Sequence, residues 1–278
     1  MSLVILQSMW AMENILPNSE TLPMPDAIAQ IKAHGFQGVT DHMMQRQQVL
    51  PLIRELKAHG LTMEGQCFPT SVDALQPTLE LAAEFRPHHV TIQPNVRTHD
   101  LKQAVALLEG WQRLAEQIDV PVYIETHRYR LTNDLLFTLE ILKELPNLQL
   151  LGDLSHYVVG HEIPFDEGAD EEIKQLQSIM RHCHAYHGRV ASREQVQIPL
   201  GFPQHQVWVE AFRALWRWGF QNWLERANKN DTLSFTCELG TRPYAITGTD
   251  GHDINDRWQD SLRLKQMAEE IWQEVIHQ

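Results

Sequence analysis

The sequence predicts an α/β fold, a (β/α)₈ barrel, and three observations support it. Short β-branched or apolar runs alternate with longer segments of helical periodicity, which is typical of a parallel sheet with helical crossovers. Eight such units occupy 278 residues, close to the roughly 250 residues of a single barrel. A short motif also recurs, as Ile31-Lys-Ala-His-Gly35 and Leu56-Lys-Ala-His-Gly60, each time between a helix and a strand. We therefore expect one barrel domain over residues 1–278.

The elements follow from the local pattern of apolar residues. Runs rich in Val, Ile, Leu and Thr predict strands at 3–6, 38–40, 61–66, 89–93, 120–125, 148–153, 179–187 and 233–238. Apolar residues at helical spacing predict helices at 25–33, 46–58, 72–84, 101–117, 133–144, 171–178, 208–226 and 258–276. Gly35 and Gly60 are expected to end their helices in the left-handed conformation.

One connection is longer than the others. It runs from Val190 to about Gln206, after the seventh predicted strand. Long loops inside compact domains are usually functional or disordered, and barrel chemistry takes place at the C-terminal ends of the strands. We therefore expect residues 190–206 to form a lid over the active site.

Composition excludes several function classes. The net charge is −13, from 23 basic and 36 acidic residues, so nucleic acid and anionic membranes are not expected partners. No apolar run reaches the 18 or so residues of a spanning helix, and no signal peptide is expected at the N-terminus. The three cysteines lie far apart in apolar runs, which favours reduced thiols in a cytoplasmic protein. The sequence leaves open whether the chain forms a homo-oligomer.

Ionisable residues occur at the ends of the last four predicted strands, namely Glu125, Asp153, His187 and Glu238. Three carboxylates that converge on one barrel mouth would repel one another, and a divalent cation would resolve that conflict. An oxygen-rich set with one imidazole suits Mn²⁺ or Mg²⁺, and is compatible with Co²⁺ or Zn²⁺. The competing interpretation is that each carboxylate separately caps a helix or pairs with an arginine.

Four short motifs carry a resemblance to a known family. They are Ile124-Glu-Thr-His-Arg128, Gly152-Asp-Leu-Ser-His156, His187-Gly-Arg-Val190 followed by Gln197, and Cys237-Glu-Leu-Gly240. In order and strand context they resemble the sugar isomerase/epimerase family of xylose-isomerase-like barrels, which includes enzymes like D-tagatose 3-epimerase. The resemblance implies that the four strand-end residues bind one divalent metal ion. It also implies that His156 and Arg189 contact oxygens of a sugar-like substrate.

The histidine ligand is ambiguous in the sequence alone. The seventh strand offers both His184 and His187, which alternation places on opposite faces. The Gly-Arg-Val that follows and the spacing to Gln197 favour His187. A bulge near the end of the strand would instead turn His184 toward the mouth.

The chemistry implied is proton transfer next to a carbonyl. A metal ion that chelates a carbonyl and the adjacent hydroxyl stabilises the enediolate formed when the α-proton is removed. We expect Glu125 and Glu238 to be the catalytic groups that remove and return this proton. Return on the opposite face gives epimerisation, whereas return on one face or to a neighbouring carbon gives isomerisation, and the sequence favours neither.

Three further residues are candidates for substrate contact. Gln93 ends the fourth predicted strand, His127 follows the fifth, and Trp10 lies near the end of the first, where its ring would stack on a sugar face or simply fill the core. Residues 248–251, Gly-Thr-Asp-Gly, follow the eighth strand, where barrels often bind phosphate, but a simple turn is the better interpretation. Whether the substrate is phosphorylated stays open.

Two other functions remain as alternatives. Metal-dependent phosphodiester hydrolases of the endonuclease IV type share this barrel and use several histidines as metal ligands. The 15 histidines of this chain are compatible with that class, whereas its net charge of −13 argues against binding to nucleic acid. A catalytically inactive barrel that binds a ligand is the other alternative, since fold alone never establishes activity.

Overall fold

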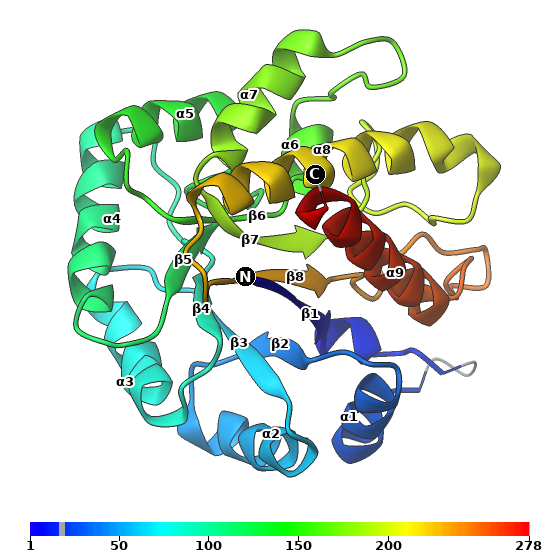
Figure 1. Cartoon of the computed structure of the whole chain (residues 1–278), viewed down its shortest axis with the longest axis horizontal. Coiled ribbons are helices and arrows are strands. Elements are labelled where there is room, and N and C mark those ends of the chain that lie inside the picture. The colour runs from blue at the N-terminus through cyan, green and yellow to red at the C-terminus, as the bar shows by residue number, and fades with distance from the viewer. Residues whose placement is uncertain (17–19, 278) are drawn as a thin grey trace.

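The barrel is closed and parallel, as predicted. The computed structural model describes residues 1–16 and 20–277. Its strands pair in the order β1 to β8, β8 pairs with β1, and helices surround the sheet (Figure 1). The strands are β1 (Ser2–Ser8), β2 (Gly38–His42), β3 (Thr62–Cys67), β4 (His89–Ile92), β5 (Val122–Glu125), β6 (Leu150–Gly152), β7 (Cys183–Gly188) and β8 (Thr232–Cys237).

The helices bury one apolar stripe each against the outside of the barrel. They are α1 (Met24–Ala33), α2 (Arg46–His59), α3 (Gln76–Phe85), α4 (Leu101–Ala115), α5 (Leu135–Glu144), α6 (Ser155–Gly160), α7 (Asp170–Met180), α8 (Gln206–Arg226) and α9 (Arg257–Ile276). Gly35 and Gly60 have φ values of +77° and +62° after α1 and α2, so the expected left-handed helix ends are confirmed. Among the described residues, no helix combines the length and apolar character that crossing a bilayer requires.

Three parts of the predicted element order were wrong. The seventh strand begins at Cys183 and not at residue 179, because Ile179 and Met180 belong to the last turn of α7 and are fully buried there. Their spacing from Leu176 continues the apolar stripe of that helix. The short helix α6, directly after β6, was not predicted, and the predicted helix at 72–84 divides into a 3₁₀ turn (Asp73–Leu75) and α3.

Alternation along the strands sorts side chains between two compartments. On β5, Ile124 points outward into the large core between sheet and helices, whereas Tyr123 points inward. Tyr123, Leu151 and Ala185 form a small apolar cluster inside the barrel. Toward the C-terminal ends of the strands the inward-facing residues are buried polar ones instead, beginning with Glu125. The interior is therefore apolar in one layer and strongly polar in the next.

The long segment after β7 is packed against the barrel. The Gln197 side-chain amide donates to the Gly240 carbonyl over 3.0 Å, and the Leu200 backbone N–H donates to Asp260 Oδ2 over 3.2 Å. Residues 196–200 are all buried. The segment is thus tied to the loop after β8 and to α9, and its role as a lid stays a prediction. Residues 248–251 form a turn between the bridged residues Thr247 and Asp253, as expected.

Candidate functional site

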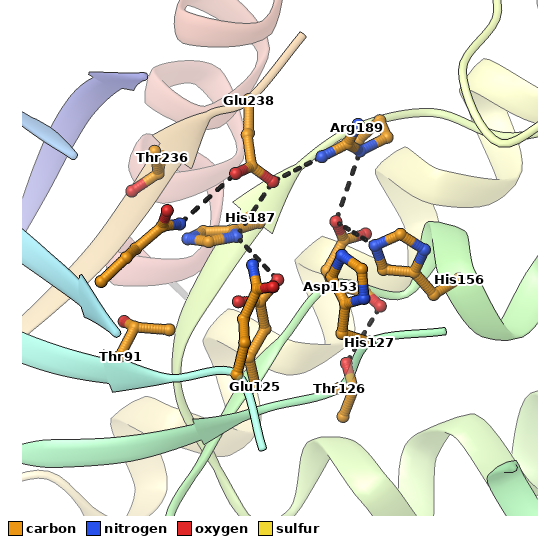
Figure 2. Close-up of polar contacts among 12 residues, drawn as sticks. Thr91, Glu125, Thr126, His127, Asp153, His156, His187, Arg189, Thr236 and Glu238 are labelled. Carbon is orange, nitrogen blue, oxygen red and sulfur yellow. Dashed lines mark hydrogen bonds and ion pairs between the residues drawn. The ribbon is translucent and has the colours of Figure 1, made fainter. Parts of the chain in front are cut away.

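Four ionisable side chains from four adjacent strands meet at one end of the barrel. Glu125 ends β5, His187 lies near the end of β7, and Asp153 and Glu238 directly follow β6 and β8. One ligand atom from each lies within 4.8 Å of those of the others, and all four side chains are buried. Figure 2 shows the His187 ring between the carboxylates of Glu238 and Glu125. The residues that the sequence singled out therefore converge on one point.

The structure brings His187, and not His184, into this cluster. His187 Nδ1 lies 3.4 Å from Glu125 Oε1 and 3.2 Å from Glu238 Oε2. His184 instead stacks on Tyr123, with ring centroids 5.6 Å apart, and its Nε2 lies 2.8 Å from Nη1 of Arg226. The register between β6 and β7 shifts at this point, so the irregularity lies at the start of β7 and leaves its end regular.

The donor set fits a divalent cation. Both carboxylate oxygens of Glu125 and Nδ1 of His187 are buried without a hydrogen-bond partner among the described residues. Burial raises the pKa of Glu125 to about 7, and it also raises the pKa of Asp153. Unpartnered buried carboxylate oxygens are costly, and a cation held by all four residues would remove that cost. The geometry thus favours a shared ligand over four separate caps or ion pairs.

Glu64, on β3, is a buried carboxylate that the sequence analysis missed. His187 Nε2 donates to its Oε1 over 2.8 Å, and the hydroxyls of Thr91 and Thr236 each donate to it over 2.7 Å. This pairing places the Nε2 proton toward Glu64 and turns Nδ1 toward the other carboxylates. Histidines that bind metals commonly donate their second nitrogen to such a carboxylate. The sequence feature that could have identified Glu64 is a glutamate in the middle of a buried strand.

The positive charge of His187 and the negative charges of Glu64 and Glu238 on either side of it stabilise one another, although the two carboxylates repel each other. Burial opposes the charged form of His187, but the surrounding carboxylates outweigh it and hold the pKa of His187 well above its usual value. Burial likewise opposes ionisation of Glu238, yet His187 and Arg189 lower its pKa to about 2. Arg189 is itself buried, and it donates from Nη2 to Glu238 Oε2 over 2.5 Å and from Nε to Asp153 Oδ2 over 3.3 Å. Arg189 therefore neutralises part of the cluster (Figure 2).

Two imidazoles form one wall beside Asp153. The rings of His127 and His156 lie 3.9 Å apart between centroids, and neither ring nitrogen of His156 has a hydrogen-bond partner among the described residues. Burial lowers the pKa of His127 to about 3 and holds that of His156 well below its usual value. Both rings are therefore neutral. Because His127 Nδ1 lies 2.5 Å from the Arg128 carbonyl, it carries the proton and leaves Nε2 as an acceptor.

The remaining candidates, Trp10 and Gln93, lie around the same end of the barrel. The Trp10 ring packs edge-on against Tyr244, with centroids 4.9 Å apart, and lies 5.6 Å from the Arg189 guanidinium. A side chain at position 240 would collide with this ring, which explains the glycine there. Gln93 follows β4, is buried, and accepts a hydrogen bond from Arg130 over 3.4 Å.

Metal affinity is expected to rise with pH across the neutral range. Glu125, with its pKa raised to about 7, must lose a proton to bind a cation below that pH. His187 must also lose its Nδ1 proton, so the affinity should keep rising above pH 7. Each proton released changes the affinity by about tenfold per pH unit. Isothermal titration with Mn²⁺ at a series of pH values measures this slope, and a flat profile below pH 7 would contradict it.

Comparisons with known proteins reveal similarity in structure only. No family model matches the sequence, and no curated protein matches it. A xylose isomerase-like TIM barrel protein from Mycobacterium smegmatis in complex with magnesium aligns over 97% of each chain, with a TM-score of 0.61 at 12% identity. D-psicose 3-epimerase from Clostridium cellulolyticum H10 aligns over 98% of this chain and 99% of its own, with a TM-score of 0.57 at 11% identity. The protein has the xylose-isomerase-like TIM-barrel fold.

This xylose-isomerase-like barrel is not tied to one reaction. A family 2 AP endonuclease from Brucella melitensis also aligns, over 86% of this chain and 93% of its own, with a TM-score of 0.54 at 12% identity. At such identities the fold is shared while the chemistry differs between neighbours. The function must therefore be argued from the site.

Proposed function

We propose that the protein is a divalent-metal-dependent isomerase or epimerase that acts on a sugar-like substrate by proton transfer through an enediolate. The observation that carries the proposal is the buried quartet of Glu125, Asp153, His187 and Glu238 at the C-terminal end of the barrel. Active sites of this fold lie at that end. The unpartnered oxygens of Glu125 support a ligand shared by the quartet over a purely structural ion-pair network.

The quartet would hold one divalent cation. When bound, such a cation supplies positive charge that polarises a carbonyl and stabilises negative charge on the neighbouring oxygen. Three carboxylates and one imidazole favour Mn²⁺ or Mg²⁺ and are compatible with Co²⁺ or Zn²⁺. The carboxylate of Glu64 keeps the His187 ring oriented for this role.

Glu125 and Glu238 are the proposed proton-transfer groups. They approach His187 Nδ1 from two sides, Glu125 from β5 at 3.4 Å and Glu238 from the end of β8 at 3.2 Å (Figure 2). A substrate held at the cation would therefore lie close to both carboxylates. One group takes the α-proton and the other returns a proton to the same or the neighbouring carbon. Return to the same carbon from the other side epimerises it, and return to the neighbouring carbon isomerises the substrate.

Five other residues are proposed to bind the substrate. His156 Nε2 lies 3.4 Å from Asp153 Oδ2, and Nδ1 is buried without a hydrogen-bond partner among the described residues, so a hydroxyl group would satisfy it. His127 offers an acceptor at Nε2, and Arg189 has donors directed at the carboxylate cluster. Gln93 and Trp10 complete the set, the first as a hydrogen-bonding group and the second as an apolar face for a sugar ring.

The test is deuterium incorporation in D₂O with the Mn²⁺-loaded protein. A panel of ketoses, keto-acids and inositol-type polyols identifies a substrate, and product formed in a single turnover is analysed by mass spectrometry. We expect deuterium at the reacting carbon, because solvent exchanges with a proton held on a carboxylate. Product without deuterium would indicate hydride transfer and contradict the proposal. Protein treated with a chelator is the control and should be inactive.

A metal-dependent hydrolase is the second candidate. Glu125, His127 and His156 form a second group that could hold a cation beside the first, and it shares Glu125 with the quartet. Metal analysis of the purified protein separates the candidates. One ion per chain supports the isomerase, three zinc ions support the hydrolase, and a protein that binds no metal would be a ligand-binding barrel.

A further inference from the structure

We propose that the substrate carries an anionic group, a carboxylate or a phosphate ester, and that the guanidinium of Arg128 binds it. The inference rests on the proposed function, because it names the substrate class of the same site. It is carried by the arrangement of arginines around the mouth of the barrel.

Arg128 lacks an acceptor for its guanidinium. The residue follows β5 in the sequence Glu125-Thr-His-Arg and is half-buried. Within residues 1–16 and 20–277, its guanidinium makes no hydrogen bond or ion pair, and its one contact is with the ring of Tyr244, 4.8 Å from the centroid. No nitrogen of Arg128 is among the buried atoms without a partner, so water reaches the guanidinium. Its five N–H donors are therefore accessible to a ligand that replaces this water.

The contacts of Tyr244 locate this guanidinium beside the metal-binding quartet. The Arg189 guanidinium also lies 4.8 Å from the centroid of the same ring, and Arg189 bonds directly to Asp153 and Glu238. The charge of Arg128 is moreover one of those that lower the pKa of His156, which places it near that imidazole. Arg128 therefore lies at the edge of the space where the substrate would bind.

Neutralisation of the quartet does not explain Arg128. Arg189 already pairs with two carboxylates of the quartet, and no carboxylate oxygen among the described residues lies within ion-pair distance of Arg128. Elsewhere in this acidic chain arginines usually have carboxylate partners, as Arg193 and Arg213 do. A positive charge that has no carboxylate partner among the described residues is thus available to an anionic ligand at the mouth.

Two neighbouring arginines extend the same positive rim. Arg130 hydrogen-bonds to the neutral Gln93 and the Tyr129 carbonyl, and its buried Nε has no partner among the described residues. Arg97 stacks on Tyr129 at 4.0 Å and, in the same described part, has no carboxylate partner. Tyr129 has a φ of +62°, a strained value for a bulky residue, and its N–H is held by Asn133. Such strain persists where the surrounding structure requires it.

The chemistry of guanidinium selects the ligand class. Its planar donors match the oxygens of a carboxylate or phosphate, and charge-assisted bonds of this kind are about twice as strong as neutral ones. The overall charge of −13 would repel an anion at long range, so a local set of unpaired arginines is needed to bind one. A neutral sugar would offer these guanidinium groups only uncharged hydroxyl acceptors.

The experiment compares three ketoses that differ only at the carbon farthest from the carbonyl. D-fructose, D-fructuronate and D-fructose 6-phosphate are titrated into the Mn²⁺-loaded protein by calorimetry. We expect at least one anionic ketose to bind ten or more times tighter than D-fructose, which has no group for Arg128, and the tighter of the two anions identifies carboxylate or phosphate.

Substitutions test the role of Arg128 itself. Arg128→Gln should weaken binding of the preferred anion by about 10- to 100-fold and leave D-fructose binding unchanged. Arg128→Lys keeps the charge but loses the planar arrangement of donors. Its affinity for the preferred anion should lie between those of the unchanged protein and of Arg128→Gln. Arg54→Gln is the matched control, because Arg54 is exposed on α2 and far along the chain from the mouth.

Three results would overturn the inference. They are equal binding of all three ketoses, no saturable binding of either anion, and an equal loss for all three ligands in Arg128→Gln. Failure of the proposed function is recognised separately, because it appears as a protein that binds no metal ion or forms product without deuterium. An anion preference in a metal-free protein would keep the role of Arg128 and reject the isomerase.

Discussion

Replacing His187 by alanine is expected to lower the affinity for Mn²⁺ by more than 100-fold, while His184→Ala leaves it unchanged. His187 directs Nδ1 at Glu125 and Glu238 within the quartet, whereas His184 contacts Tyr123 and Arg226 at the start of the same strand. The second substitution is a matched control, because it removes the same side chain from the same strand. Calorimetry with Mn²⁺ measures both.

Glu64→Gln should lower the affinity for Mn²⁺ by about 10- to 100-fold, which is less than the loss expected for His187→Ala. This is the usual cost of removing a partner that orients a metal-binding histidine. The amide keeps the shape of the side chain, and its single oxygen accepts from one of the two hydroxyls of Thr91 and Thr236, but it lacks the charge that faces His187 Nε2. Unchanged affinity in His187→Ala, or a larger loss in His184→Ala, would reject the assignment of the histidine ligand.

Glu238→Gln is expected to lose about 10²- to 10⁴-fold in turnover while retaining weakened metal binding. An amide oxygen still coordinates a cation and accepts from Gln66 or Arg189, which donate to different oxygens of Glu238, but it does not take up a proton. The loss should therefore appear in kcat more than in KM, since the interaction removed is one made in the transition state.

The control for this substitution is Glu80→Gln, which removes a carboxylate from the exposed face of α3. Turnover on the substrate found in the panel, together with metal content, distinguishes the proton-transfer role from simple loss of the cation. Near-normal turnover in Glu238→Gln with full metal occupancy would remove Glu238 from the catalytic pair.

The barrel and the convergence of the quartet were predictable because both follow from short-range patterns. Strand–helix alternation implies a parallel sheet, and all its strands end on the same face, so Glu125, Asp153 and Glu238 had to approach one another. The boundary between α7 and β7 was less predictable. Ile179 and Met180 are apolar and suit either element, and only their packing against the barrel assigns them to the helix.

Other parts of the site depend on contacts between residues far apart in the sequence. Glu64 meets His187 across the barrel, and Arg128 and Arg189 share the ring of Tyr244. No local pattern reports such a pairing, because the register and closure of the barrel determine which inward-facing side chains meet.

Local sequence patterns were sufficient to predict the eight-unit barrel and the strand-end positions of the quartet, and composition alone gives the net charge of −13. Contacts between distant strands show which histidine joins the quartet, that Glu64 pairs with it, and that Arg128 stacks on Tyr244 with no carboxylate partner among the described residues. This difference arises because periodicity and strand ends are encoded within a few residues. Hydrogen-bond partners and unpaired charges, in contrast, exist only once the barrel closes and brings distant strands together.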